Sequence, residues 1–433
     1  MNTIKYILIV VNLILSSFYL FPINFVVLPN VNTKMAMAAF SLVILFVKFA
    51  MSRKHNIDSS FLRLSMLAIL VSLISYIAII INNTRDYSYV TYFISMWVWV
   101  GGAYTLVYVL KAVHGRMTVR LLCNYFIAVC VAQCILAILI DQLPFVKDFV
   151  DSHIGSFGFN ASNMVSGYGH RHRLYGIGAA LDFSGIRFSA VLIMIAAMIT
   201  HQDIKESKEL PLYITSFLII AIIGNMMSRT TTVGVIIAIL YLLFKLQGTP
   251  LYSNRKLIMW SATLLLSAIF LVVSLYHSSA VVNRYLEFGF EGFFSIARTG
   301  EWQTNSNDIL INMIKFPKDI KTWLIGDGYF ENPSTDIYYI GQQWKGFYMG
   351  TDIGYLRFIF YFGIVGLFTF CLFFCRVSKI CGEKHYQYIS LFTALLILNF
   401  VVWFKVSTDI FVVFAPFLCF ISNENTLSNS LSL

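Results

Sequence analysis

Arginine side chains recur in the polar stretches that separate long apolar runs of this 433-residue chain. A guanidinium binds phosphate oxygens through charge-assisted hydrogen bonds, so such a set suits an anionic ligand. Arg229 is the strongest single candidate, because its turn, GNMMSRTTTVG, also supplies hydroxyls and the amides of a helix start. The other candidates are Arg171, Arg173, Arg187, Arg298 and Arg357. For any one of them, snorkelling to phospholipid headgroups or pairing with a loop carboxylate is an equal alternative.

Two histidines stand beside two of these arginines in the segment GYGHRHRLYGIGAALDFSG, residues 167–185. His170 and His172 suit a general base or a phosphate-binding cation, and His172 is a candidate catalytic residue. No cysteine or carboxylate spacing around them predicts a zinc site. The alternative is that HRHR forms a basic patch on anionic lipid.

Carboxylates in the second half of the chain are candidates for removing a proton from a hydroxyl. Asp352 is the first choice, because in GTDIGYLRF it stands where a polar stretch enters an apolar run. Arg357 follows about a turn and a half later along a helix. Glu301, in ARTGEW, is the second choice. Asp352 equally suits a helix cap, and that alternative stays open.

Helices in a lipid bilayer must position these residues. Hydrophobic residues make up 58% of the chain and charged residues only 12%, which favours lipid over water as the solvent. A membrane span needs about 20 apolar residues, and in lipid such a run is a helix. We expect about twelve spans, over residues 4–24, 34–51, 61–82, 89–110, 119–140, 183–200, 211–227, 230–246, 257–276, 352–375, 386–402 and 405–422.

Lysine and arginine in alternate connectors fall on one side of these spans, which the positive-inside rule makes cytoplasmic. Both termini then lie in the cytoplasm, and two long connectors, 141–182 and 277–351, lie outside. N-terminal helices occupy residues 1–140, central helices 183–276 and C-terminal helices 352–433. The net charge of +10 is scattered and offers no basic run for nucleic acid.

The order of motifs around the second long connector resembles the O-antigen polymerase and ligase superfamily. ARTGEW leads into NDILINMIKF, whose spacing predicts a short amphipathic helix over 307–316 at the membrane surface. LIGDGYF and GTDIGYLRFIFYFGIVGL follow, and the earlier SRTTTVG turn is similar as well. Ligases of this superfamily usually carry a His-Asn pair where this chain has Thr351-Asp352, which favours a polymerase.

The resemblance implies an all-α, GT-C-like polytopic protein of the bacterial inner membrane, with two long periplasmic loops. It implies a glycosyltransferase that joins undecaprenyl-pyrophosphate-linked repeat units at the periplasmic face during lipopolysaccharide O-antigen biosynthesis. Arg229 and Arg173 would hold the departing diphosphate, and Asp352, Glu301 or His172 would accept the proton. No cofactor, metal or nucleotide sugar is implied. The implied partners are membrane lipids, a chain-length regulator and a flippase, without nucleic acid.

Two other functions stay open. An O-antigen ligase would use the same donor and the same arginines, but would transfer the glycan to lipid A core. A polysaccharide transporter or flippase would carry charged or Gly/Pro-broken positions in mid-membrane and paired halves. This chain instead keeps its charge at the outer rim and has no internal repeat.

Overall fold

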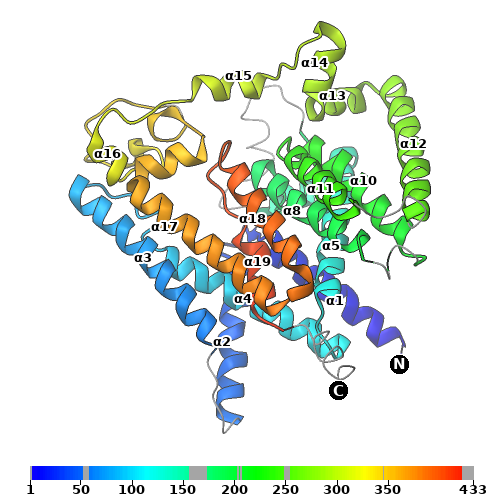
Figure 1. The fold of residues 1–433 in the computed structure, drawn as a ribbon, viewed down its shortest axis with the longest axis horizontal. Coiled ribbons are helices and arrows are strands. Elements are labelled where there is room, and N and C mark those ends of the chain that lie inside the picture. The colour runs from blue at the N-terminus through cyan, green and yellow to red at the C-terminus, as the bar shows by residue number, and fades with distance from the viewer. Residues whose placement is uncertain are drawn as a thin grey trace.

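The computed structural model describes residues 2–51, 58–155, 173–201, 204, 207–247, 254–344 and 346–421. Most of these residues are helical, and Figure 1 shows the helices packed into a bundle that carries short helices at one end. Within the described ranges, nine helices are long and apolar enough to cross a membrane. The chain is therefore an all-α polytopic membrane protein.

The long apolar helices form most of the bundle. They are α1 (Asn2–Leu20), α2 (Thr33–Met51), α3 (Ser59–Asn82), α4 (Tyr92–His114), α5 (Val119–Gln142), α8 (Leu181–Ile199), α10 (Leu210–Met227), α12 (Arg255–Ser278) and α17 (Gly354–Lys384). Shorter apolar helices are α11 (Thr231–Leu246), α18 (Ile389–Val402), which follows the turn η4 (Tyr386–Tyr388), and α19 (Phe411–Leu418). Most of them lie within a few residues of the runs expected from the sequence.

The expected span over 405–422 is the main exception, because its described part contains only α19, a helix of eight residues. Such a helix is about 12 Å long, too short to cross about 30 Å of hydrocarbon. The indole of Trp403 donates to the Thr408 carbonyl over 3.1 Å, and the Asp409 carboxylate accepts the Phe411 amide over 2.9 Å. Before residue 411, these side-chain contacts take the place of the regular backbone hydrogen bonds of a helix. Every residue of α19 is buried, so protein rather than lipid surrounds it.

Short elements fill the connectors. The helical ones are α6 (Pro144–His153), α13 (Ala280–Gly289), α14 (Glu291–Thr299), α15 (Asn305–Asn312), α16 (Ile320–Leu324), η2 (Pro333–Thr335) and η3 (Tyr348–Gly350). Strands β1 (Asn24–Phe25), β2 (Leu28–Asn32) and β3 (Ile154–Gly155) form an antiparallel sheet in the order β2-β1-β3. The amphipathic helix expected over 307–316 is α15, which begins and ends earlier and buries no residue. Figure 1 shows α13, α14 and α15 at the end of the bundle away from the start of α1.

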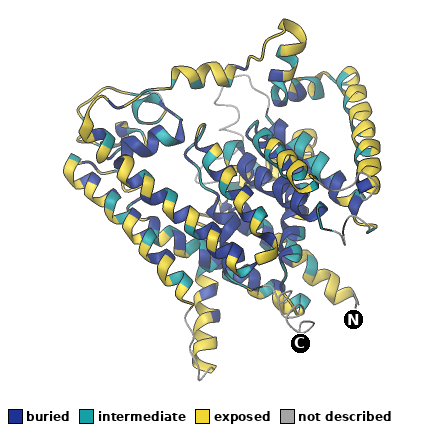
Figure 2. Ribbon diagram, in the orientation of Figure 1, coloured by how far each residue is buried: buried dark blue, intermediate teal, exposed yellow. Residues whose placement is uncertain are grey.

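Helix α8 lies at the centre of the bundle. Every residue from Ser184 to Ile199 is buried, and α10 and α11 pack against this helix. Figure 2 shows the buried centre in dark blue and the exposed outer helices largely in yellow. In α12, Leu257 is the only described buried residue, and the exposed side chains are mostly apolar, as expected of a helix that faces lipid.

Helix α17 is kinked where it contacts the long connector 277–351. Gly363 has a φ of 69°, and a Cβ at this position would lie 2.1 Å from the Leu324 carbonyl oxygen, so glycine is required. The amides of Asp327 and Gly328 donate to α17 carbonyls just before the kink, over 2.6 and 3.1 Å. The Gly-x-Gly turn of LIGDGYF therefore docks the connector onto α17.

Candidate anion-binding site

A turn between α10 and α11 carries Ser228, Arg229 and Thr230. Thr230 is the N-cap of α11, so the positive end of that helix dipole lies at the turn. The Ser189 hydroxyl of α8 donates to the Thr230 carbonyl over 3.0 Å. Gly185 lets α8 lie close to the turn, because a Cβ at this position would lie 2.5 Å from the Ser228 hydroxyl oxygen. The turn is therefore held firmly against the central helix.

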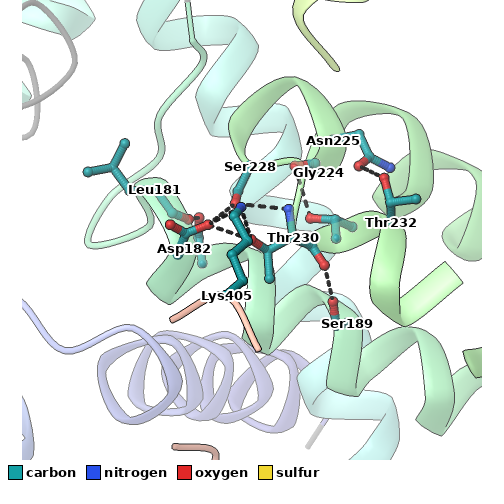
Figure 3. A network of polar contacts seen from close by, with 11 residues as sticks. Leu181, Asp182, Ser189, Gly224, Asn225, Ser228, Thr230, Thr232 and Lys405 are labelled. Carbon is teal, nitrogen blue, oxygen red and sulfur yellow. Dashed lines mark hydrogen bonds and ion pairs between the residues drawn. The ribbon is translucent and has the colours of Figure 1, made fainter. Parts of the chain in front are cut away.

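Asp182 and Lys405 meet at this turn, as Figure 3 shows. The Thr230 hydroxyl donates to the Asp182 carboxylate, and the Ser228 hydroxyl does so over 3.3 Å. The Lys405 ammonium lies 3.1 Å from the same carboxylate and 2.9 Å from the Thr230 hydroxyl. Three distant segments thus converge: the start of α8, the turn before α11 and the connection between α18 and α19.

Neither Asp182 nor Lys405 was predicted from the sequence. Lys405 is the first residue of one expected span, and Asp182 directly precedes another. The polar run KVSTD, between two apolar runs, was the available signal for Lys405. For Asp182, its place within the segment 167–185, which carries the histidines and arginines, was the available signal.

Arg173 and Arg229 converge on one aromatic ring, that of Phe288 in α13. Their guanidinium carbons lie 4.7 and 4.8 Å from its centroid, which is the geometry of a cation–π contact. Arg229 also forms an ion pair with Glu291 of α14, and its side chain is 13% exposed. The two arginines, far apart in the sequence, therefore provide concentrated positive charge.

A polar cavity of about 510 Å³ extends from Arg229 along α13, α14 and the start of α15. Its charged lining residues are Arg229, Arg284, Glu287, Glu291, Arg298 and Asp308. Arg298 forms an ion pair with Glu287, and its side chain is 61% exposed. Two of the cavity's arginines, Arg229 and Arg298, thus pair with carboxylates that belong to α13 and α14.

Asp352 lies half-buried just before α17. Burial raises the pKa of its carboxyl above the usual value; Arg357 and Lys405 oppose this rise, and Asp182 adds to it. Because Asp182 and Lys405 influence it, Asp352 belongs to the neighbourhood of the turn at Arg229. The N-cap of α17 is Ile353, without a side-chain hydrogen bond, so Asp352 does not cap this helix. A carboxylate with a raised pKa is suited to accepting a proton near neutral pH.

Arg357 occupies an enclosed position. Its guanidinium lies between the rings of Phe330 and Phe347, 3.8 and 3.4 Å from their centroids. It donates to the Ser407 hydroxyl over 2.7 Å and to the Phe330 carbonyl over 2.9 Å, and it lies 3.3 Å from the Glu331 carboxylate. Arg357 therefore ties the large connector and the segment before α19 to α17.

The remaining candidates lie elsewhere or outside the description. Arg187 is buried in α8 with its guanidinium carbon 5.5 Å from the centroid of the Phe21 ring. Glu301 is exposed after α14, where its carboxylate accepts the Gln303 amide over 3.3 Å. Arg171 and His172 lie outside the described residues, as does His170.

The fold and this site define a polytopic membrane protein that carries an arginine-bearing site at one end of its helical bundle. No protein-family model matches the chain, and neither a curated protein nor a solved structure matches it. Among the described residues, no group of three or more His, Cys, Asp or Glu side chains is arranged to hold a metal ion. The residues of the site are therefore the basis for inferring a function.

Proposed function

We propose that this chain is an O-antigen polymerase, a GT-C-like glycosyltransferase that joins undecaprenyl-pyrophosphate-linked repeat units. One observation carries the proposal: Arg173 and Arg229 converge on Phe288 at the end of the bundle where Asp352 enters α17. Concentrated guanidinium charge suits a diphosphate, and a nearby carboxylate suits an acceptor hydroxyl. Donor and acceptor chemistry thus have candidate groups in one neighbourhood.

In the proposed reaction, an acceptor hydroxyl oxygen attacks the anomeric carbon of the donor glycan. The bond from this carbon to the diphosphate oxygen breaks, and the diphosphate leaves with the electron pair. The hydroxyl proton passes to the Asp352 carboxylate. Arg173 and Arg229 stabilise the negative charge that develops on the leaving oxygen, because their positions are fixed before the reaction begins.

Carboxylates hold the cations before the donor binds. Glu291 pairs with Arg229, and Asp182 pairs with Lys405. An incoming diphosphate carries more negative charge than one carboxylate, so it competes with Glu291 for Arg229. Arg173 contacts the ring of Phe288, which belongs to α13.

The proposal places this end of the bundle and the two long connectors in the periplasm and both termini in the cytoplasm. Residues 405–418 then form the last, only partly helical crossing, because Lys405 contacts Asp182 and the Leu418 carbonyl accepts from Lys384 at the end of α17. Cysteine labelling tests the orientation in a variant without the seven native cysteines. Ile340→Cys, at a fully exposed site in the large connector, should react with a membrane-impermeant maleimide in intact cells. Arg116→Cys, in the connector between α4 and α5, should react only after lysis. The opposite pattern would reject the proposed orientation.

Glycan length in a strain that lacks the gene tests the activity. A polymerase defect leaves single repeat units on the lipid A core, and the native chain should restore long polymer. A bare core would instead identify an O-antigen ligase or a polysaccharide transporter or flippase, because without transport no repeat unit reaches the core. Unchanged long polymer would reject all three functions.

A further inference from the structure

An apolar groove lies between α10 and α12, with α5 and α13 at its ends. Its volume is about 640 Å³, and aliphatic side chains such as Ile222 of α10 and Leu271 of α12 form most of its lining. In α12, Leu257 is the only described buried residue, so one wall of the groove is a helix exposed to the surrounding lipid. The groove therefore suits a hydrocarbon chain that arrives sideways from the bilayer.

One end of this groove reaches the arginine pair. Leu174, Met226 and Leu286 line that end. Leu174 directly follows Arg173, and its amide donates to the Met226 carbonyl over 3.2 Å. Leu286 lies two residues before Phe288, whose ring both arginines contact. The apolar groove therefore lies next to the cationic site, because residues close together in the same segments belong to each.

A polar contact lies among the groove's lining residues. The Tyr285 hydroxyl donates to the Asp141 carboxylate, and both residues line the groove. This hydrogen bond joins the end of α5 to α13. The separate cavity at Arg229 is lined largely by charged and polar residues, and the two cavities share no lining residue.

We propose that this groove holds the isoprenoid chain of the lipid carrier while Arg173 and Arg229 bind its diphosphate. The inference rests on the function proposed above, because it takes the donor to be a prenyl diphosphate. An apolar groove beside a cation pair matches a ligand with one long chain and an anionic head. The donor then enters laterally between α10 and α12, and its chain fixes the distance of the diphosphate from Asp352.

Binding to the full chain in phosphatidylcholine nanodiscs tests this assignment. The probes are undecaprenyl diphosphate, which has chain and head, and inorganic pyrophosphate, which is the head alone. Leu271→Trp and Ile222→Trp fill the groove, and each should weaken undecaprenyl diphosphate binding at least tenfold while leaving pyrophosphate binding unchanged. Arg229→Ala should weaken the binding of both probes.

Leu266→Trp is the matched control, because Leu266 also belongs to α12 and is exposed but does not line the groove. It should leave both affinities unchanged. Retained undecaprenyl diphosphate affinity in both groove variants, or an equal loss in Leu266→Trp, would overturn the assignment. So would equal competition by phosphatidylglycerol, which would identify the ligand as an ordinary anionic phospholipid.

The outcome is separable from that of the proposed function. If the groove variants behave as expected but the gene deletion leaves polymer length unchanged, the chain binds a prenyl diphosphate without polymerising glycan. If the deletion removes polymer but the groove variants bind normally, the polymerase proposal stands and the groove assignment is wrong.

Discussion

Arg229 and Arg357 each combine an aromatic contact with a carboxylate, yet their surroundings differ. Arg357 lies between two rings, is 6% exposed and donates to groups from two other segments. Arg229 shares one ring with Arg173, pairs with Glu291 and faces a cavity of about 510 Å³. A guanidinium that joins segments, such as that of Arg357, is enclosed by them. A guanidinium suited to a ligand, such as that of Arg229, faces a cavity, and a ligand can compete for it with the carboxylate of Glu291.

The largest effect should come from Arg229→Ala, which should lower the rate of chain extension by about 100-fold or more, as expected for a lost transition-state donor. Arg229→Lys should recover part of the rate, because it restores the charge without the planar fork. Extension of purified lipid-linked repeats in proteoliposomes measures both. A normal rate of chain extension in Arg229→Ala would show that Arg229 does not act in the reaction, so that its role would no longer differ from that of Arg357.

Arg357→Ala should act on stability instead. It leaves a buried carbonyl and hydroxyl without their donor, so the free energy of unfolding should fall by about 3 kcal/mol. Undecaprenyl diphosphate binding by the folded fraction should persist. Thermal unfolding in detergent, followed in parallel with Arg229→Ala, separates the two roles. A stable Arg357→Ala variant that no longer binds the diphosphate would assign Arg357 to the site.

Two neighbours of Asp352 should shift the pH profile in opposite directions. The reaction needs this carboxyl deprotonated, so the rate should rise as pH increases through its pKa. Lys405 lowers that pKa and Asp182 raises it. Lys405→Met should therefore move the acid limb of the pH–rate profile to higher pH, and Asp182→Asn should move it to lower pH. Shifts in the same direction would show that Asp352 is not the base.

The smallest effect should come from Arg298→Ala. Its exposed pair with Glu287 is screened by water, so the pair contributes little to stability. We expect less than about a threefold loss of chain-extension rate, with little change in unfolding temperature. A loss as large as that of Arg229→Ala would show that facing the cavity, rather than the shared ring of Phe288, defines the functional arginines.

The sequence was sufficient to predict the helices because an apolar run in lipid has no other way to satisfy its backbone. It failed over 405–422, where apolar composition continued while Ser407, Thr408 and Asp409 ended the regular hydrogen-bonding pattern. Hydropathy alone does not separate a span from a short helix enclosed by protein. That distinction depends on neighbours far away in the chain.

The sequence was sufficient to select the candidate arginines by residue type, but it did not predict which of them binds a ligand and which joins segments. Whether Arg229 or Arg357 faces a cavity depends on Phe288, Phe330 and Phe347, which tertiary packing brings to them. No spacing in the sequence relates these rings to their cations. Asp182 and Lys405 were missed for the same reason, since their pairing joins two segments that lie 223 positions apart.

A double-variant cycle on Arg173 and Arg229 tests the central claim most directly. The affinity of the full chain for undecaprenyl diphosphate is measured for Arg173→Ala, Arg229→Ala and the variant with both changes. If the two guanidiniums bind one diphosphate, each single change should weaken binding strongly, and the double change should weaken it much less than the product of the single effects. Unchanged affinity in either single variant, or losses that simply multiply, would contradict a shared diphosphate site.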